Sequence, residues 1–411
     1  MAVTFMQNHS FEPNYAPQTV FFPMTNVIQN YAWGSPSSFT QLFGTENQTG
    51  EPQAEIWMGA HPNGCSTVSN QSGEPTKLSC LIAQNINAFL SEKVASRFGE
   101  LPYLFKVLAA EKALSIQVHP NKTQAERGFA LEEQLGIPHS AGNRNYKDAN
   151  HKPELVYALT EYHAMNGFRP VKEIIANFTD LAIPELDSLL SHLRANPNAR
   201  GLSLFFSDLL SIEGEAKHQA INALLAHANH CADPLFALII ELENQYPGDI
   251  GLFAPLMLNV ITLQPGQAMF LDAETPHAYL KGTGLEIMAN SDNVLRAGLT
   301  PKFMDINELV SCTRFDEKPL ESLLLNPTEQ DDMLEYPIPV EDFKFAIVSH
   351  SKQRQIHTES AEILLPLDGA MVLTHGNGES CSIEKGQSVF IPAYADNYII
   401  DCEGRVARAY S

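Results

Sequence analysis

The segment LQPGQAMFLDAETPHAYL, residues 263–280, has the pattern of a strand, a glycine turn, a strand, a second turn and a third strand. The segment IEKGQSVFIPAYADNYII, residues 383–400, repeats this pattern at an offset of 120 residues, which aligns Gly266 with Gly386. Two copies of such a unit predict two small double-sheet barrels of the cupin or jelly-roll kind. The alternative is that G-Q-x-x-F is only a common tight turn, and the sequence alone leaves both open.

The rest of the chain divides around these two segments. β-like runs punctuated by Gly, Pro and Asn extend from Val20 to about Leu159. One helix interrupts them, and Thr123 with Glu126 predicts its capping box. Leucines at helical spacing follow, and strands return after Tyr246. We predict a mainly β fold: a cupin-like/jelly-roll barrel at 21–168 and 247–315, an α-helical insertion at 169–246, and a second C-terminal β barrel-like domain at 316–411, after an N-terminal tail at 1–20.

Charge and cysteine usage limit the possible partners and location. The 411-residue chain has 48 acidic and 26 basic residues, a net charge of −22, which argues against nucleic acid and anionic membrane surfaces as partners. No apolar run is long enough to cross a bilayer, and the N-terminus lacks the pattern of a signal peptide. Six scattered cysteines without C-x-x-C suit a reducing compartment. We expect a cytoplasmic protein; its oligomeric state is not determined by the sequence, and a monomer is compatible with it.

The segment SIQVHPNK, residues 115–122, raises the possibility of a metal site. Gln117 and His119 are two residues apart in an apolar run, so on a strand both side chains point to the same face. Each buried polar group without a partner would cost roughly 1–3 kcal/mol. Either the two side chains form a hydrogen-bonded surface pair, or they converge on a ligand.

Two more polar side chains on apolar strands would complete a metal site. Glu154 begins an apolar run and His277 enters a strand after a proline. With Gln117 and His119 they make a set of two nitrogens and two oxygens, which suits zinc and leaves a net charge of about +1 for polarising a carbonyl. Spacing alone is a weak signal, because a lone histidine after a proline is more often a loop residue.

The C-terminal unit is predicted to lack the metal. The 120-residue offset places Asn397 where the first copy has His277. A second Q-x-H occurs at Gln355 and His357, but no counterpart of the K-P-E segment follows it. We expect this unit to be a metal-free cupin-like β domain that packs against the first barrel.

Longer motifs resemble a known family. The segments QNYAWGS, AEIWMGAHPNG, LPYLFKVLAAEKALSIQVHPNK, NHKPEL, PGQAMFLDAETPHAYL and GLEIMANSDNVLRAGLTPKF are similar to those of the type I mannose-6-phosphate isomerases. The resemblance runs from Asn26 to about Asp305 and is looser beyond. It implies an aldose–ketose isomerase with one zinc per chain. Its small-molecule partner would be a sugar phosphate, mannose 6-phosphate or fructose 6-phosphate.

The resemblance also implies the site residues. By motif, the zinc ligands fall on Gln117, His119, Glu154 and His277, and Arg296 matches the active-site arginine. The residues that it places in or beside the pocket are Lys106, Ser115, His151, Lys152, Tyr279, Glu286, Asp292 and Lys302.

Chemistry suggests roles for several of these groups. Isomerisation through a cis-enediol(ate) needs a base near C1 and C2, a cation near O1 and O2, and an anchor for phosphate. Arg296 is a poor base but suits an anionic oxygen, whereas Asp292 and His151 are candidate bases. Lys152 could assist ring opening. The candidate phosphate ligands are Lys106, Ser115 and Lys302, while Tyr279 and Glu286 are expected to contact substrate.

Two other classes of function fit a cupin barrel. An iron dioxygenase would show iron and oxygen uptake, but a Gln in place of a third His and the Arg/Lys-rich pocket argue against it. A non-catalytic sugar-phosphate sensor would bind without turnover, but the intact ligand set with Arg296 and Asp292 argues against that.

Overall fold

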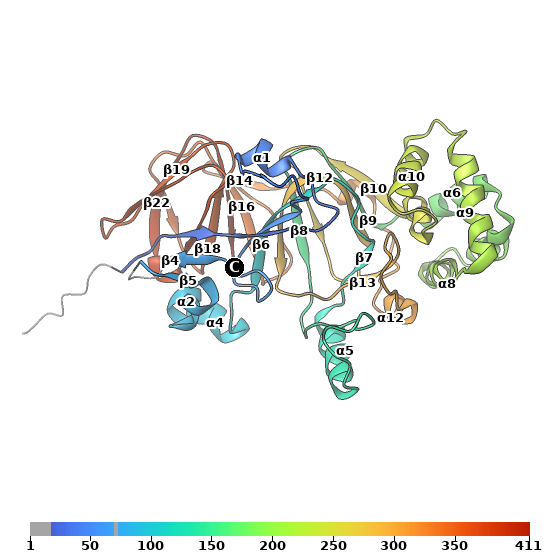
Figure 1. The fold of residues 1–411 in the computed structure, drawn as a ribbon, viewed down its shortest axis with the longest axis horizontal. Coiled ribbons are helices and arrows are strands. Elements are labelled where there is room, and N and C mark those ends of the chain that lie inside the picture. Colours follow the sequence, from blue (N-terminus) through green and yellow to red (C-terminus); the bar gives the residue numbers. More distant parts are fainter. Residues whose placement is uncertain (1–17, 70–72) are drawn as a thin grey trace, which may run out of the picture.

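The computed structural model of the chain describes residues 18–69 and 73–411, so most of the tail predicted at 1–20 lies outside the described residues. The mainly β fold is confirmed: a cupin-like catalytic barrel, a helical insertion and a β-rich C-terminal unit. Figure 1 shows the barrel between the C-terminal strands on one side and the helical unit on the other. No helix in the described part combines the length and apolar character that a bilayer crossing requires.

The central barrel is built from strands that are distant in sequence. Its 10-stranded sheet has the main path β10-β9-β12-β6-β3-β2, with β7, β8, β11 and β13 joined to it. The strands are β2 (Val27–Gln29), β3 (Glu55–Met58), β6 (Tyr103–Ala110), β7 (Gln117–Val118), β8 (Glu154–Ala158), β9 (Tyr162–Phe168), β10 (Leu258–Leu263), β11 (Ala268–Leu271), β12 (His277–Ala289) and β13 (Leu295–Arg296).

Strand β12 closes the barrel because it belongs to both halves of the sheet. Its first residues pair with β9 and β7, and its later residues pair with β6 and β8. The change occurs at Gly282, whose φ of 117° is unfavourable for other residues. A Cβ there would lie 2.4 Å from the carbonyl oxygen of Glu161, so the close approach of the two chains also requires glycine.

The helical insertion packs against one end of this barrel. Its amphipathic helices bury the side chains of Phe178, Leu193 and Phe205 in a hydrophobic core. This core continues to Met165 and Ala278 of the barrel strands. The helices are α6 (Val171–Leu181), η1 (Pro184–Leu186), α7 (Asp187–Ala195), α8 (Ala199–Leu210), α9 (Gly214–Ala228), α10 (Pro234–Gln245), η2 (Ile250–Phe253) and α11 (Ala254–Met257).

The helix predicted after SIQVHPNK is present but begins before the predicted cap. It is α5, Lys122–Gln134, and it projects from the barrel in Figure 1. The capping box is formed by Asn121 and Gln124, each side chain bonding to the backbone N–H of the other. The prediction of Thr123 and Glu126 was therefore two residues late, because Asn caps helices as well as Thr does.

The C-terminal unit includes strands from the N-terminus. Strand β1 pairs with β21, with Phe22 opposite Phe390, and so extends the 9-stranded sheet β14-β15-β16-β23-β18-β21-β1-β4-β5. Its strands are β1 (Phe22–Thr25), β4 (Thr67–Ser69), β5 (Pro75–Lys77), β14 (Thr328–Gln330), β15 (Met333–Glu335), β16 (Lys344–Ser349), β18 (Glu362–Pro366), β21 (Ser388–Ile391) and β23 (Arg405–Tyr410).

A 4-stranded sheet of order β17-β22-β19-β20 completes this unit. Its strands are β17 (Arg354–His357), β19 (Met371–Thr374), β20 (Ser380–Ile383) and β22 (Asn397–Cys402). The remaining helices are α1 (Ser38–Phe43), α2 (Leu78–Ala83), α3 (Ile86–Leu90), α4 (Glu92–Phe98), α12 (Ile306–Ser311), η3 (Leu320–Ser322) and η4 (Ala393–Ala395).

The two β units share a hydrophobic core. Phe105 and Tyr157 of the catalytic barrel pack against Phe345 of the C-terminal unit, with ring centroids 6.2 and 5.6 Å from it. The buried Tyr103 hydroxyl bonds to the carbonyl oxygens of Ala361 and Ala409 at 3.1 and 3.0 Å. The C-terminal unit therefore packs directly on the barrel that contains the candidate site.

The repeat seen in the sequence corresponds to matching strand pairs. Leu271 of β11 pairs with Glu154 of β8, and Ile391 of β21 pairs with Glu362 of β18. Leu271 and Ile391 are equivalent at the 120-residue offset. The two glutamates therefore occupy the same position in the two barrels, and each opens an apolar run, ELVYAL at 154–159 and EILLPL at 362–367.

The offset does not continue into the next strand of the C-terminal unit. Residues Ala393–Ala395 form a short 3-10 turn, and Asp396 follows with a φ of 61°. Tyr398 is then fully buried, whereas Asn397 is half-buried and bonds to the exposed Gln355. Asn397 thus does not occupy the inward position that His277 has in the catalytic barrel.

Candidate metal centre and active-site cleft

Three predicted metal ligands converge in the catalytic barrel. His119, Glu154 and His277 are buried, and one potential ligand atom from each lies within 4.8 Å of the others. His277 begins β12 and pairs with Gln117 of β7, while Glu154 begins β8. Gln117 lines the same small cavity as Glu154 and His277. The barrel therefore brings together residues that are up to 160 positions apart in the chain.

The two imidazoles are held with their Nε2 atoms facing the carboxylate. Nδ1 of His119 lies 2.7 Å from the Asn293 carbonyl oxygen, and Nδ1 of His277 lies 2.8 Å from that of Thr275. A carbonyl only accepts, so each Nδ1 carries a proton and each Nε2 is the atom turned toward Glu154. These Nε2 atoms lie 3.2 and 3.5 Å from the oxygens of Glu154.

This arrangement fits a divalent cation. Lone pairs facing carboxylate oxygens repel one another unless a positive charge lies between them, and His119 Nε2 is buried with no hydrogen-bond partner among the described residues. Burial and then the nearby Lys152 charge lower the pKa of His119 to about 4, so the ring is neutral near pH 7. A neutral nitrogen and carboxylate set is what zinc binds.

The carboxylate ligand is kept ionised by its surroundings. Burial alone would raise the pKa of Glu154, but the Lys152 charge, with Nζ 3.3 Å from Oε1, holds it well below its usual range. The Tyr279 hydroxyl donates to Oε2 at 2.7 Å. Tyr279 and Lys152 therefore orient the ligand without occupying the space between the three side chains.

Asn293 is a supporting residue that the sequence interpretation missed. It is fully buried, and its carbonyl fixes the tautomer of His119. Its side-chain oxygen accepts from the N–H groups of Lys147 and Asp148, and its amide donates to the carbonyls of Asp148 and Asn150. The segment ANSDN, residues 289–293, was the available signal, because consecutive Asn, Ser and Asp often bond to the backbone.

A cleft of about 550 Å³ opens beside the metal ligands. Its wall includes Gln117, Ser115 and Lys152, next to the metal ligands, and Asp292, Arg296 and Lys302. The cleft is large enough for a small ligand such as a sugar phosphate. The remaining lining residues are Tyr31, Ala32, Trp33, Glu55, Trp57, Lys106, Leu114, Tyr246, Met288, Val294, Leu299, Thr300 and Pro301.

Lys106 is already neutralised by two carboxylates. Its Nζ lies 2.8 Å from Glu286 and 3.5 Å from Glu55, and the Trp57 indole N–H donates to Glu55 at 2.7 Å. Although burial opposes the charged form, these carboxylates raise the pKa of Lys106 above its usual value. Glu55 and Trp57 were missed in the sequence, where AEIWMGA offered only a polar residue at a strand start.

Arg296 and Lys302 are the cleft cations without a carboxylate partner in the described chain. Burial lowers the pKa of Arg296, and burial followed by the charges of Arg296 and Lys147 lowers that of Lys302. Mutual repulsion among these groups favours an anion between them. They form the electropositive end of the cleft.

Asp292 and His151 differ in their access to the cleft. Asp292 lines the cleft and accepts from Asn63 Nδ2 at 2.9 Å, with His61 Nε2 3.4 Å away. His151 is absent from the lining residues, and its Nε2 lies 2.9 Å from Asp342 in the C-terminal unit. Of the two candidate bases, the structure places only Asp292 at the cleft wall.

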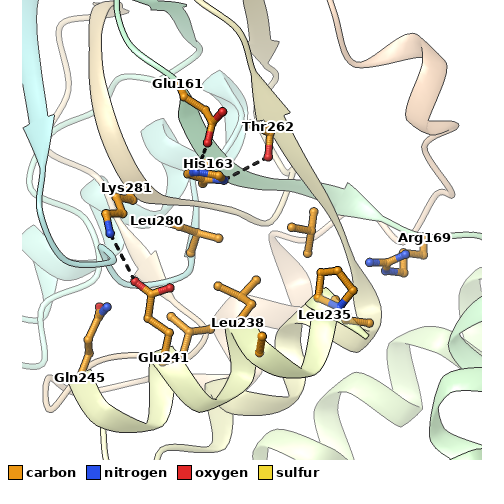
Figure 2. Close-up of a pocket in the computed structure, with 14 residues that line it drawn as sticks. Glu161, His163, Arg169, Leu235, Leu238, Glu241, Gln245, Thr262, Leu280 and Lys281 are labelled. Atoms are coloured by element: carbon orange, nitrogen blue, oxygen red, sulfur yellow. Dashed lines mark hydrogen bonds and ion pairs between the residues drawn. The ribbon is translucent and has the colours of Figure 1, made fainter. Parts of the chain in front are cut away.

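A larger groove of about 690 Å³ lies elsewhere, between α10 and strands β9, β10 and β12 (Figure 2). Leu235, Leu238 and Leu280 line its apolar part. Among its charged groups, Lys281 pairs with Glu241 at 3.9 Å and His163 with Glu161 at 3.0 Å, while Arg169 pairs with Glu173 outside the lining. None of the metal-ligating side chains belongs to it, so size alone would have indicated the wrong cavity.

Comparisons with known proteins agree with this geometry. Residues 21–171 match the type I phosphomannose isomerase catalytic domain, 179–258 the helical insertion domain, and 332–411 the mannose-6-phosphate isomerase cupin domain. Mannose-6-phosphate isomerase of Escherichia coli is 47% identical over 94% of this chain and 99% of its own, and that of Homo sapiens 36% over 90% and 93%. A zinc-bound crystal structure of mannose 6-phosphate isomerase superposes with a TM-score of 0.91 at 46% identity, covering 96% of this chain and all of that one. The chain belongs to the type I phosphomannose isomerase family.

Proposed function

We propose that this protein is a zinc-dependent aldose–ketose isomerase that interconverts D-mannose 6-phosphate and D-fructose 6-phosphate through a cis-enediol(ate). The observation that carries this function is the buried trio of His119, Glu154 and His277, which lies behind the cleft residues Gln117 and Lys152. The similarity to isomerases over nearly the whole chain supports it.

The metal would be held by the predicted set. His119 and His277 would donate Nε2, Glu154 a carboxylate oxygen, and Gln117 its amide oxygen. When bound, zinc supplies a Lewis acid that polarises sugar oxygens. The residues that fix this set in place are Asn293, Thr275 and Tyr279, through the hydrogen bonds described above.

The proton transfer is assigned to Asp292. Isomerisation of the aldose removes the proton from C2 and returns a proton to C1, so one carboxylate can accept it and then deliver it. Burial would raise the pKa of Asp292, but the hydrogen bond from His61 and the charges of Lys152 and Lys106 keep it below its usual value. Asp292 is therefore ionised at neutral pH and ready to act as the base.

Lys152 and Arg296 have electrostatic roles in this proposal. Lys152 lies between Glu154 and the cleft and can donate to the ring oxygen or O1 during ring opening. Arg296 stays protonated and can donate two parallel hydrogen bonds to an anionic oxygen. His151 is assigned a supporting role beside the site. Its contact with Asp342 would hold the loop before Lys152 in place.

Phosphate recognition is assigned to the unpaired end of the cleft. Arg296 and Lys302 carry charge that no carboxylate compensates, and Ser115 adds a hydroxyl. Lys106 was a further candidate, but Glu55 and Glu286 already neutralise it. Lys106 and Glu286, with Tyr279, are better suited to contacts with sugar hydroxyls than to binding a dianion.

The proposal also covers the domain organisation, the cellular location and the partners of the protein. Residues 21–168 with 247–315 are proposed as the catalytic domain, 169–246 as the helical insertion, and 316–411 as the second β domain. The matched ranges support this order of units, but the matched helical range ends at 258, so η2 and α11 belong with the insertion. We place the protein in the cytoplasm without nucleic-acid or membrane partners, and a monomer is compatible with this proposal. The six cysteines, all free, support a reducing compartment.

A coupled assay with purified protein tests the function. Zinc-loaded protein should convert mannose 6-phosphate to fructose 6-phosphate, and zinc-stripped protein should not. Binding of mannose 6-phosphate without turnover would favour a sensor instead, and oxygen uptake with bound iron would favour a dioxygenase. Either result would overturn the isomerase assignment.

A further inference from the structure

The segment GAHPNG, residues 59–64, contains His61 and forms a tightly fixed loop. The Gly59 N–H donates to the Ser66 hydroxyl at 3.1 Å, and the Gly64 N–H donates to the His61 carbonyl at 3.0 Å. A Cβ at Gly64 would lie 2.6 Å from the Trp57 ring, so only glycine lets the loop lie this close. The loop is therefore held against the wall of the cleft.

The loop presents two hydrogen-bond donors to Asp292. The backbone N–H of Asn63 donates to Nδ1 of His61 at 3.2 Å, so Nδ1 is the acceptor and Nε2 carries the proton. That Nε2 lies 3.4 Å from Oδ1 of Asp292, and the Asn63 side-chain amide donates to Oδ2 at 2.9 Å. The His61 ring is buried and stands edge-on to Trp57, with centroids 5.0 Å apart.

We propose that His61 and Asn63 are positioning residues that aim the Asp292 carboxylate at the substrate. Each carboxylate oxygen receives one donor and keeps a lone pair for the substrate proton. Asp292 takes the proton from C2 as the C–H electron pair forms the C1–C2 double bond of the enediolate. A proton then passes from O2 to O1, and Asp292 returns its proton to C1 as the C2 carbonyl forms. The inference rests on the proposed function, because it assumes that Asp292 is the base.

Other groups around Asp292 cannot replace these donors. Lys106 is bonded to Glu286, and Lys152 to Glu154, so both act on Asp292 only through their charge. The charge of Asp292 also acts on Lys147 and Tyr31. The backbone N–H of Asp292 donates to the Asp148 carboxylate at 2.7 Å. In the described chain, the side-chain hydrogen bonds to this carboxylate come from the 59–64 loop.

The proposal predicts a shift in the pH profile as well as a loss of rate. His61→Ala removes a donor that favours the ionised form, so the pKa of Asp292 should rise. The acid limb of kcat/KM should therefore move to higher pH. General bases contribute roughly 10²–10⁴-fold to rate, and misplacing one should remove part of this, roughly 10-fold in kcat. His61→Gln, whose amide can donate in place of Nε2–H, should restore most of both.

Zinc content and unfolding are measured on every variant, so that loss of metal or fold is recognised. His163→Ala serves as the matched control, because His163 is also bonded to a carboxylate, Glu161 at 3.0 Å, but lies in the remote groove. It should change neither kcat nor the acid limb. If His61→Ala does not fold, Asn63→Ala tests the second donor in the same two measurements.

Asp292→Asn separates this inference from the proposed function. If Asp292→Asn keeps wild-type kcat, Asp292 is not the base and both assignments fail. If Asp292→Asn loses activity but the folded His61 and Asn63 variants keep the wild-type kcat and acid limb, the base assignment stands and the positioning role is wrong. A loss of kcat with a shifted acid limb, restored by His61→Gln, supports the positioning role.

Discussion

Glu362 in the C-terminal barrel occupies the same strand position as Glu154, the proposed metal ligand in the catalytic barrel. Each faces an equivalent residue of the neighbouring strand, Ile391 or Leu271. Each carboxylate accepts from a buried tyrosine hydroxyl, at 2.8 and 2.7 Å. Glu154 belongs to the proposed metal site, where a bound cation would compensate its negative charge. Glu362 requires a different positive charge.

The compensating cation in the C-terminal barrel is Arg408. It pairs with Leu364, two residues after Glu362, just as Glu286 pairs with Val156, two residues after Glu154. Its Nε donates to Glu362 at 2.9 Å, and its Nη2 bonds to the other oxygen. The guanidinium thus supplies the positive charge within the C-terminal barrel itself.

The two glutamates should respond differently to the same substitution. Glu154→Gln should lose zinc and activity, because a ligand charge is removed. Glu362→Gln should keep one zinc per chain and wild-type activity. It should lose roughly 3–5 kcal/mol of stability, because Arg408 is left buried and unpaired. Metal analysis, the coupled assay and urea unfolding measure these effects.

The double variant Glu362→Met with Arg408→Met is the matched control. Removing both buried charges should cost much less than removing one, since hydrophobic replacement of a buried ion pair is often neutral. Loss of zinc from the Glu362→Gln variant, or a second zinc in the wild-type protein, would show that the C-terminal barrel holds a metal and that this interpretation is wrong.

The neutral ligands should also be necessary for metal binding. His119→Ala leaves His277 and Glu154 without a third protein ligand of the trio, and Gln117→Ala removes an amide oxygen. Both should lower zinc affinity and turnover, with the larger loss at the buried imidazole. Competition with a chelator measures the affinity. Unchanged zinc affinity in His119→Ala would exclude His119 as a ligand.

Much of this site follows from local sequence patterns, and the remainder depends on the fold. The strand position of Gln117 and His119, and the turn before His277, are local features that predict their orientation. Asn293, His61 and Glu55 were missed because their roles come from contacts with distant residues, such as His119 and Asp292. Sequence spacing does not encode such contacts.

The fold shows the same division between local and long-range information. Helices and turn-bounded strands were recognisable from hydrophobic period and glycines. The pairing of β1 with β21, which joins residues more than 360 positions apart, was not. The sequence offset also misplaced Asn397, because Tyr398, which bonds to Glu362 as Tyr279 bonds to Glu154, shows that the offset falls from 120 to 119 residues in this strand.

Arg296 should contribute to rate and not to metal binding. A preorganised donor in a partly water-excluded site typically contributes roughly 10²–10³-fold. Arg296→Ala should lower kcat on this order with zinc content and unfolding unchanged. Arg296→Lys should recover only part, because an ammonium cannot form the two parallel bonds. A rise in KM with kcat preserved would instead indicate a ground-state phosphate contact.

Lys302 should give the enzyme an alkaline limit on substrate affinity. Its pKa is lowered by burial and by the charges of Arg296 and Lys147, so it loses its proton at a lower pH than an ordinary lysine. The sugar phosphate is then a dianion, so KM should rise as pH increases through that pKa. In Lys302→Arg the charge persists, and KM should stay flat over the same range. An identical rise in both proteins would exclude Lys302 as the titrating group.

Zinc titration of metal-free enzyme tests the central claim most directly. Protein stripped of metal by a chelator is titrated with zinc, and mannose 6-phosphate turnover is measured at each step. The site formed by His119, Glu154 and His277 predicts that activity rises linearly and reaches its maximum at one zinc per chain, with no activity at zero. Full activity in the metal-free protein, or a maximum only at two zinc ions per chain, would contradict this account.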